Sequence, residues 1–280
     1  MFTLNCKGRL LVAGQPLVMG IINLTPDSFY AGSRAAHTDA VLRQAEQMLL
    51  EGASILDLGA QSTRPGSREA GATEELRRLQ EPLSALHRHF PETPVSIDTY
   101  HALVAREMVA AGASIVNDIS GGTFDPLMIE TVGRLGVPYI CMHLKGTPET
   151  MHQSPHYDDI ALEVLDHFIA RTDVCRSAGI HDVIIDPGFG FSKTPAHNFE
   201  LLRRLSVLRM LEKPILVGLS RKSTIYKTLS VSPEEALNGT TVLNTISLLN
   251  GAGILRVHDV KAAMEAIKLV QAYQETKSTR

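Results

Sequence analysis

Cysteine is scarce in this chain, which has three among 280 residues. Cys6, Cys141 and Cys175 are odd in number, and none has the Cys-x-x-Cys spacing of a redox or zinc motif. These features exclude a disulfide framework and a zinc knuckle. We therefore expect three ordinary reduced thiols.

Long apolar runs and basic clusters are also missing. No segment approaches the roughly 18 consecutive apolar residues of a membrane-spanning helix, and residues 1–14 lack the charged and apolar regions of a signal peptide. A formal net charge of -3 without a basic block argues against general binding to nucleic acid or to a membrane surface. We expect a cytoplasmic protein that binds small molecules.

Hydrophobic residues make up 44% of the chain, which is enough to form a large core. Because α/β barrels of about 250 residues are routinely single domains, we expect one domain over residues 1–280. Phe2–Cys6 and Arg9–Val12 flank a Lys-Gly turn, which predicts a β-hairpin within residues 1–16. This hairpin is expected to close one end of the core.

Short apolar segments then alternate with helical patterns, often with a glycine just before the apolar segment. A helix that ends at a C′ glycine and is followed by a buried strand produces this pattern. Eight strands are predicted, at Leu17–Ile22, Ser54–Leu58, Val95–Ile97, Ser114–Asn117, Pro138–Met142, Val183–Ile185, Ile215–Gly218 and Ile254–Val257. The alternation predicts an α/β fold, a TIM (β/α)8 barrel, with a doubly wound open sheet as the alternative.

Two helix starts are predicted from capping residues. Thr38 fits an N-cap ahead of an apolar stripe that ends at Gly52. Ser232 opens a Ser-Pro-Glu-Glu capping box with proline at the first helical position, ahead of the last predicted strand.

The segment Val183–Lys193 is the most informative part of the sequence. Its β-branched run stops at Asp186, and a proline and two glycines then turn the strand into a loop that carries Phe189 and Phe191. A carboxylate, two rings and accessible backbone suit a planar ligand that forms hydrogen bonds. A simple turn beside two core aromatics would have the same sequence, so the ends of the other strands must decide.

Nearly every predicted strand ends in a polar or charged side chain. The carboxyl ends of barrel strands meet on one face, where TIM-barrel enzymes hold their active sites. The side chains expected at this face are Asn23, Ser62, Thr63, Arg64, Asp98, Asn117, His143, Asp186, Ser220, Lys222, Arg256 and His258. Chance polarity at loop starts does not explain such a concentration of charge, so we expect a functional site.

These side chains suit two chemistries. One group offers acceptors and an amide for the donor edge of a pterin or guanine, between apolar walls, and comprises Asp98, Asn117, Asp186, Met142 and Phe191. The other suits a diphosphate with a magnesium ion, and comprises Arg64, Arg256 and His258 with Asn23 as a neutral oxygen ligand. A ring at one end and a diphosphate at the other describe an activated alkyl donor.

Seven segments together resemble the dihydropteroate synthase family. They occur in the family's order over almost the whole chain: MGIINLTPDSF (19–29), STRPG (62–66), SIDT (96–99), NDI (117–119), DPGFGF (186–191), SRKS (220–223) and RVHD (256–259). Two positions depart from the family pattern, since Gln61 replaces the usual glutamate before STRPG and Ser192 replaces a glycine.

The resemblance implies condensation of p-aminobenzoate with 6-hydroxymethyl-7,8-dihydropterin diphosphate in folate biosynthesis, by a homodimer that is a sulfonamide target. It implies pterin contacts from Asp98, Asn117, Met142, Asp186, Phe191, Gly218 and Lys222. It implies magnesium diphosphate contacts from Asn23, Thr63, Arg64, Arg256 and His258, with Asn23 on the metal. It implies p-aminobenzoate contacts from Thr63, Pro65, Phe191, Ser220 and Lys222, and places Asn23, Asp98, Lys222 and Arg256 in catalysis.

The expected reaction is a dissociative substitution. An arylamine is unprotonated near neutral pH and needs no general base, so the departing diphosphate is the difficult part. Asp98 would offset the positive charge that develops on the ring. Three alternatives share features of this sequence: a methyltetrahydrofolate methyltransferase-like barrel, a non-catalytic pterin-binding barrel, and a Schiff-base aldolase that uses Lys222.

Overall fold

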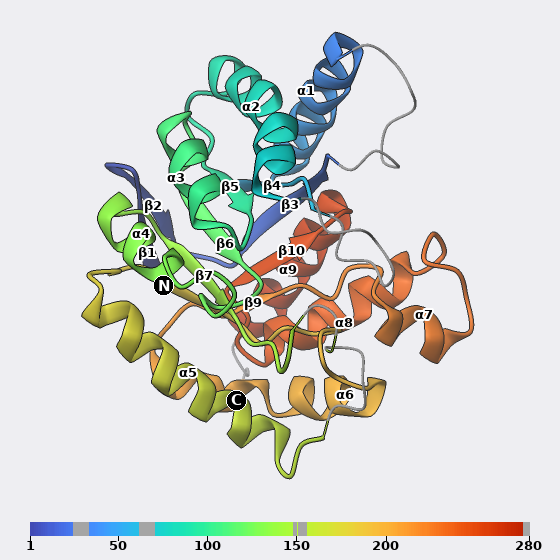
Figure 1. Ribbon diagram of the computed structural model, residues 1–280. Coiled ribbons are helices and arrows are strands. Elements are labelled where there is room, and N and C mark those ends of the chain that lie inside the picture. Colours follow the sequence, from blue (N-terminus) through green and yellow to red (C-terminus); the bar gives the residue numbers. More distant parts are fainter. Residues whose placement is uncertain (25–33, 62–70, 148–149, 151–155, 277–280) are drawn as a thin grey trace.

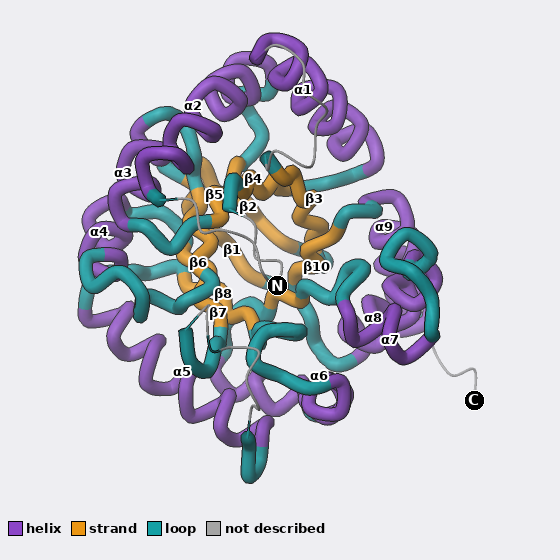
Figure 2. The backbone as a smooth tube through the Cα atoms, turned by 45° about the vertical axis from the view of Figure 1, so that its right-hand side comes forward, coloured by secondary structure: helices purple, strands orange, loops and turns teal. Residues whose placement is uncertain are grey.

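The computed structural model describes residues 1–24, 34–61, 71–147, 150 and 156–276. It confirms the predicted TIM barrel. The inner strands are β3 (Leu17–Asn23), β4 (Ile55–Gly59), β5 (Val95–Asp98), β6 (Ile115–Asp118), β7 (Tyr139–Met142), β8 (Val183–Asp186), β9 (Leu216–Val217) and β10 (Ile254–Val257). Figure 2 shows these strands as an inner ring surrounded by helices.

The ring is closed. Hydrogen-bonded neighbours follow the order β8-β7-β6-β5-β4-β3-β10-β9, and every pair is parallel. A parallel bridge between Ile185 and Ile215 then joins β8 to β9, where the Ile185 amide donates to the Pro214 carbonyl at 3.0 Å. This closure excludes the doubly wound open sheet.

Helices cover the outside of the ring in chain order (Figure 1). They are α1 (Arg34–Glu51), α2 (Ala72–His89), α3 (Ala102–Ala110), α4 (Met128–Leu135), α5 (Ile160–Ser177), α6 (Pro195–Arg203), the 3-10 helix η1 (Leu205–Leu211), α7 (Ser223–Leu229), α8 (Leu237–Leu249) and α9 (Val260–Glu275). In the described part of the chain, none of them is long and apolar enough to span a membrane.

Two predicted helix starts need correction. Thr38 is buried inside α1, which begins at Arg34, because residues such as Ala36 favour helix and extend it toward the N-terminus. Ser232 does form the capping-box bonds with Glu235, at 3.0 and 3.4 Å. They close a separate turn, however, and α8 begins only at Leu237.

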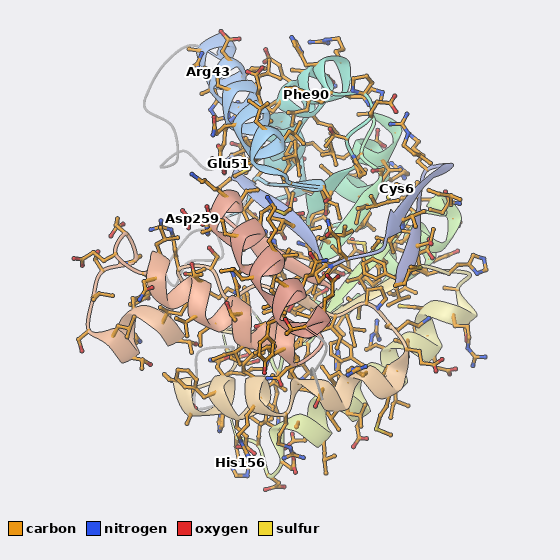
Figure 3. The ribbon with its side chains drawn as sticks, turned by 180° about the vertical axis from the view of Figure 1, so that it is seen from behind. Cys6, Arg43, Glu51, Phe90, His156 and Asp259 are labelled. Atoms are coloured by element: carbon orange, nitrogen blue, oxygen red, sulfur yellow. The ribbon has the colours of Figure 1, made fainter. Side chains whose placement is uncertain are left out.

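The predicted hairpin is formed by β1 (Phe2–Cys6) and β2 (Arg9–Ala13), which pair antiparallel. Its inner side chains Leu4, Cys6 and Ala13 are buried against the lowest layer of the barrel interior. The apolar side chains of that layer are Leu17, Met19, Ile55, Ile115, Ile140, Ile184, Leu216 and Ile254. Figure 3 shows the molecule from behind, with the hairpin marked by the label of Cys6. The hairpin closes this end of the barrel.

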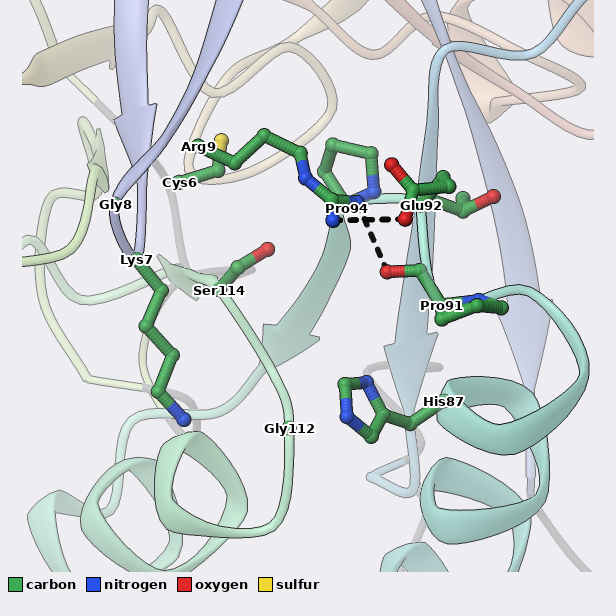
Figure 4. A pocket seen from close by; sticks show the side chains of 11 residues that line it. Cys6, Lys7, Gly8, Arg9, His87, Pro91, Glu92, Pro94, Gly112 and Ser114 are labelled. Atoms are coloured by element: carbon green, nitrogen blue, oxygen red, sulfur yellow. Dashed lines mark hydrogen bonds and ion pairs between the residues drawn. The ribbon is translucent and has the colours of Figure 1, made fainter.

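A pocket of about 380 Å³ lies between the hairpin turn and the end of α2 (Figure 4). Arg9 crosses it, with Nη1 donating to the Pro91 carbonyl and Nη2 to Glu92, both at 2.9 Å. None of the described side chains that are predicted to bind substrate lines this pocket. The candidate site therefore belongs to the opposite end of the barrel.

The hairpin should contribute directly to stability. Leu4 is 1% exposed and Leu10, in the same hairpin, is 65% exposed. Leu4→Ala should lower the free energy of unfolding by about 2–5 kcal/mol, because it leaves a cavity against the apolar layer. Leu10→Ala is the matched control and should change it by less than about 0.5 kcal/mol. Urea denaturation would measure both, and equal effects would mean that the hairpin does not seal the core.

Candidate active site

The polar face of the barrel follows from strand alternation. Successive side chains of a strand point to opposite faces, so a residue two positions beyond an inward apolar residue also points inward. Ile55, Ile184 and Ile254 of the lowest layer are thus followed inward by Asp57, Asp186 and Arg256. The same step places Asn117, Met142 and Gly218 above Ile115, Ile140 and Leu216.

Arg256 is the centre of this upper layer. Its Nε donates to Asp57 Oδ2 at 2.7 Å, and its Nη2 donates to Asp98 Oδ2 at 2.7 Å. Asn117 Nδ2 donates to the same Asp57 oxygen at 3.1 Å. One guanidinium thus binds two carboxylates from different strands. Asp98 and Arg256, expected in separate ring and diphosphate groups, lie in direct contact.

The charges of this network support each other. Burial alone would lower the pKa of Arg256, but the charges of Asp57 and Asp98 more than offset this and raise it above its usual value. Burial raises the pKa of Asp98, whereas Arg256 acts in the opposite direction. The guanidinium is therefore a permanent cation in the centre of the face, and the ionised form of Asp98 depends on it.

Asn23 and Asp98 lie in one row across the sheet. In the pairing register, Asn23 is opposite Gly59, Gly59 is opposite Asp98, and Asp98 is opposite Asn117. Gly59 keeps the space between the two polar residues open, because a Cβ there would lie 3.4 Å from that of Asp98. The predicted metal ligand and the predicted catalytic carboxylate are thus separated by one residue of β4.

The predicted apolar walls are also brought together. Met142 is opposite Asp186 in the register of β7 and β8. It belongs to a small apolar cluster with Tyr100 and Ile119, against which Phe191 packs. Asp186 itself is buried and accepts a hydrogen bond from the Gly188 amide at 2.8 Å. A carboxylate therefore stands beside an apolar surface, as a planar heterocycle with a donor edge requires.

Lys222 lies across the loop that follows β8. Its Nζ donates to the Phe189 carbonyl at 2.6 Å and lies 4.6 Å from the centre of the Phe191 ring. A Cβ at Gly218 would lie 3.8 Å from Lys222 Nζ and 3.9 Å from Arg256 Cβ, so this glycine lies between the two cations. Burial lowers the pKa of Lys222 to about 8, although Asp186 acts in the opposite direction.

Ser220 and His258 form a pair at the ends of β9 and β10. Ser220 Oγ lies 3.0 Å from His258 Nδ1 and accepts the His258 amide at 3.2 Å. Next to them, Arg221 binds both carboxylate oxygens of Asp259 at 2.9 Å. These contacts hold the two loops together, so that Lys222 and His258 keep fixed positions.

Thr63, Arg64 and Pro65 lie outside the described residues, and their predicted roles stay predictions. The two departures from the family pattern are visible. Gln61 Nε2 donates to the Tyr100 hydroxyl at 2.6 Å, so a neutral amide links the end of β4 to the segment after β5. Ser192 has φ of +45°, a conformation that glycine adopts more easily.

Two charged residues of the face were not predicted from the sequence. Asp57 lies inside an apolar strand, two residues after Ile55. This spacing could have predicted that its side chain points into the barrel. Lys193 is buried under the loop after β8, with Nζ 2.9 Å from His143 Nδ1. A lysine after a glycine-rich segment carries no comparable signal, because only the folded loop turns it inward.

The chain is similar to known pterin-binding enzymes over almost its whole length. A family model described as pterin binding enzyme matches residues 19–258. The dihydropteroate synthase of Escherichia coli K12 is 40% identical over 279 residues, which cover 99% of this chain and 98% of the relative. A Yersinia pestis dihydropteroate synthase solved with a sulfonamide drug complex has a TM-score of 0.91 and 40% identity, with 99% of this chain and 100% of that chain covered. A Xanthomonas albilineans dihydropteroate synthase solved with 4-aminobenzoic acid has a TM-score of 0.91 and 38% identity, covering 98% of this chain and 99% of that chain.

The central ion pair should be essential to stability. Arg256→Met removes the cation and leaves two carboxylates facing each other, one of which, Asp57, is 0% exposed. The free energy of unfolding at pH 7 should fall by about 3–5 kcal/mol.

The exposed Arg9–Glu92 pair, at 2.9 Å, offers a matched control. Arg9→Met should cost less than about 1 kcal/mol. Adding Asp57→Asn to Arg256→Met should restore part of the loss, because one uncompensated charge is removed. Urea denaturation in which the Arg256 variant costs no more than the Arg9 variant would refute this account of the network.

Proposed function

The chain belongs to the pterin-binding enzyme family, and within it to the dihydropteroate synthases. From this membership we propose the role of each site residue in the reaction. The enzyme condenses p-aminobenzoate with 6-hydroxymethyl-7,8-dihydropterin diphosphate, giving 7,8-dihydropteroate and diphosphate. These roles rest mainly on one observation, the contact between Arg256 and Asp98. It joins the cation proposed to bind diphosphate to a carboxylate proposed to bind the ring.

The pterin binds between Asp186 and the Asp98–Asn117 side of the barrel in this proposal. Carboxylates accept from the ring's adjacent N–H groups, and the Asn117 amide supports recognition of its polar edge. Met142 and Phe191 cover the ring with apolar surface. Gly218 leaves room for it below Lys222, whose ammonium completes the pocket.

Diphosphate binds to Arg256 and His258, together with Arg64 and Thr63. A guanidinium has five N–H donors, so Arg256 can hold phosphate oxygens while it keeps part of its contact with Asp57. The arriving anion competes with Asp98 for the cation. Asp98 is thereby released toward the pterin at the moment when the leaving group is bound.

Magnesium is part of the same proposal, with Asn23 as its protein ligand. In the described residues no group of three or more His, Cys, Asp or Glu side chains could hold a metal ion. This fits a magnesium ion held by one amide oxygen, water and substrate phosphates, since this ion rarely occupies an all-protein cage. The ion would neutralise charge on the leaving diphosphate.

The substitution is dissociative. The electron-rich dihydropterin delocalises the positive charge left on the methylene carbon, and Asp98 offsets it from β5. The p-aminobenzoate ring lies against Phe191 and is held by Ser220 and Lys222 with Thr63 and Pro65. Its amine already carries a free lone pair, and so the enzyme needs no base to activate it.

We further propose that two copies form a homodimer through α8 and α9. Val242, Ile246 and Leu249 are exposed at helical spacing on α8, and Leu269 and Tyr273 are exposed on the adjoining α9. An apolar surface of this kind suits a symmetric contact. Sedimentation of the wild type and of Ile246→Glu tests it, and a monomeric wild type would refute it.

An assay with the two purified substrates tests the function. Dihydropteroate should form only with pterin diphosphate and p-aminobenzoate together, should require magnesium, and should be inhibited by a sulfonamide in competition with p-aminobenzoate. Methyl transfer from methyltetrahydrofolate, or pterin binding without turnover, would instead identify one of the alternatives. Borohydride trapping of Lys222 with a carbonyl substrate would indicate an aldolase.

Asp98 should affect turnover more than pterin affinity. Asp98→Asn keeps the shape and one acceptor for Arg256 but loses the charge that offsets the cationic ring. We expect kcat to fall by a factor equivalent to about 2–4 kcal/mol, while the Kd of the pterin diphosphate changes by less than about tenfold. Asp57→Asn removes the charge of the other carboxylate bound to Arg256, below the site, and is the control, with a smaller effect on kcat. Equal losses of affinity and turnover in Asp98→Asn would argue against this role.

Lys222 should set an alkaline limit on the reaction. Its pKa is lowered to about 8 by burial, against the influence of Asp186. As the pH rises through about 8 the ammonium loses its proton, so kcat/KM should fall by about tenfold per pH unit above that value. Lys222→Arg keeps its charge throughout this range, so its kcat/KM should not fall above pH 8 in this way. A pH profile that is identical in the wild type and in Lys222→Arg would exclude Lys222 as the titrating group.

A further inference from the structure

We propose that Lys193 is a positioning residue for the reaction: its ammonium fixes the loop after β8, and with it Phe191, in the conformation that binds both substrates. The inference deepens the proposed function and rests on it, because Phe191 is placed there against the pterin and p-aminobenzoate. The hydrogen bonds of the Lys193 ammonium go to the protein itself, at His143, Gly188 and Phe191.

Four acceptors converge on the Lys193 ammonium. Its Nζ lies 2.9 Å from His143 Nδ1, 3.1 Å from the Gly188 carbonyl, 3.1 Å from the Phe191 carbonyl and 3.5 Å from the His143 carbonyl. The lysine is 8% exposed, so these contacts replace water almost completely. A buried ammonium needs such partners, and it gives a donor to all three carbonyls, of which that of Gly188 also accepts from the Phe191 amide at 3.1 Å.

The backbone of the loop is bent so that these carbonyls meet. Gly188, Gly190 and Ser192 all have positive φ, at +69°, +81° and +45°. At Gly188 a Cβ would lie 2.1 Å from the His143 carbonyl, so only glycine allows this approach of the loop to the end of β7. A serine with positive φ stores strain and persists only where its surroundings hold it.

Ser192 is indeed held from both sides. Its Oγ accepts from the Lys145 amide at 2.9 Å, and its carbonyl accepts from the Tyr157 hydroxyl at 3.0 Å. Lys193 follows directly and anchors the loop from below. The loop is therefore fixed by several polar contacts rather than by apolar packing alone.

The anchored segment carries the groups that meet Lys222. Lys193 holds the carbonyls of Gly188 and Phe191, and between them the Phe189 carbonyl accepts from Lys222 Nζ at 2.6 Å. The Phe191 ring lies 4.6 Å from the same nitrogen. Loss of the Lys193 ammonium would free both ends of this segment, so the Phe191 ring and Lys222 would move together.

Removal and chemical replacement of the ammonium test the proposal. Lys193→Ala should raise the KM of p-aminobenzoate and of pterin diphosphate by about tenfold each, since one loop contact of about 1.4 kcal/mol is lost to both, while kcat changes much less. Propylammonium fits the vacated stem and should restore both KM values. Propyltrimethylammonium has the same charge but no N–H donors and should not restore them.

Lys145→Ala is the matched control. That lysine is adjacent to the same loop, but its ammonium binds the His156 carbonyl and Glu163, at 2.7 and 2.9 Å, and touches the loop only through the Tyr157 ring, at 4.5 Å. Its removal should leave both KM values within about twofold of the wild type. Lys193→Met keeps the stem without the donors and substitutes for Lys193→Ala if the alanine variant does not fold.

A measurement independent of turnover separates this inference from the proposed function. In protein labelled with 4-fluorophenylalanine, the Phe191 fluorine signal, assigned with Phe191→Leu, should shift in Lys193→Ala and return with propylammonium. A wild type that makes no dihydropteroate would refute the function, and the fluorine experiment would still decide the role of Lys193. Unchanged KM values and an unchanged signal would overturn the positioning role, as would equal rescue by both amines. Failure of both Lys193 variants to fold would reduce Lys193 to a purely structural residue.

Discussion

Arg256 lies between two carboxylates in the interior of a closed barrel, and the arrangement of the polar face depends on this contact. Closure forces the inward side chains of all strands into one space, where an unpaired charge would be very costly. Asp57, Asp98 and Asn117 come from three neighbouring strands, and Arg256 from a fourth. The charged side chains of the site are therefore paired with one another, Arg256 with Asp57 and Asp98.

This constraint also explains why the two ends of the barrel differ. One alternation step separates Ile254 from Arg256, Ile55 from Asp57 and Ile184 from Asp186. The hairpin packs against the lower layer, so the apolar core at this end lies directly beneath the charges of the polar face. A register shift of one residue in any strand would exchange the two faces of that strand.

Much of this could be predicted from the sequence, because the relevant signals are local. Apolar runs that end in polar residues located all the strands, and the ends of those strands located Asn23, Asp98, Asn117, Asp186 and Arg256. The sequence could not predict which of these charged side chains bind one another. The contact of Arg256 with Asp57 and Asp98 spans 199 and 158 residues and depends on strand order around a closed ring. Thr38 failed as a helix cap for a local reason, since helix-favouring residues such as Ala36 extend α1 to Arg34.

The proposed binding of substrate would exchange contacts of these buried charges without a movement of the barrel itself. Asp98 binds Arg256 at 2.7 Å, and Lys222 is held by the Phe189 carbonyl at 2.6 Å. In the proposed reaction the pterin diphosphate supplies a new partner for both groups of the ion pair, since its diphosphate is an anion for Arg256 and its pterin edge offers N–H donors to Asp98. Binding thus exchanges one satisfied contact for another, which keeps the desolvation cost of the buried charges low. The same exchange gives specificity: a ligand with a ring but no diphosphate would leave Arg256 bound to Asp98, and the carboxylate would then be less available to the ring.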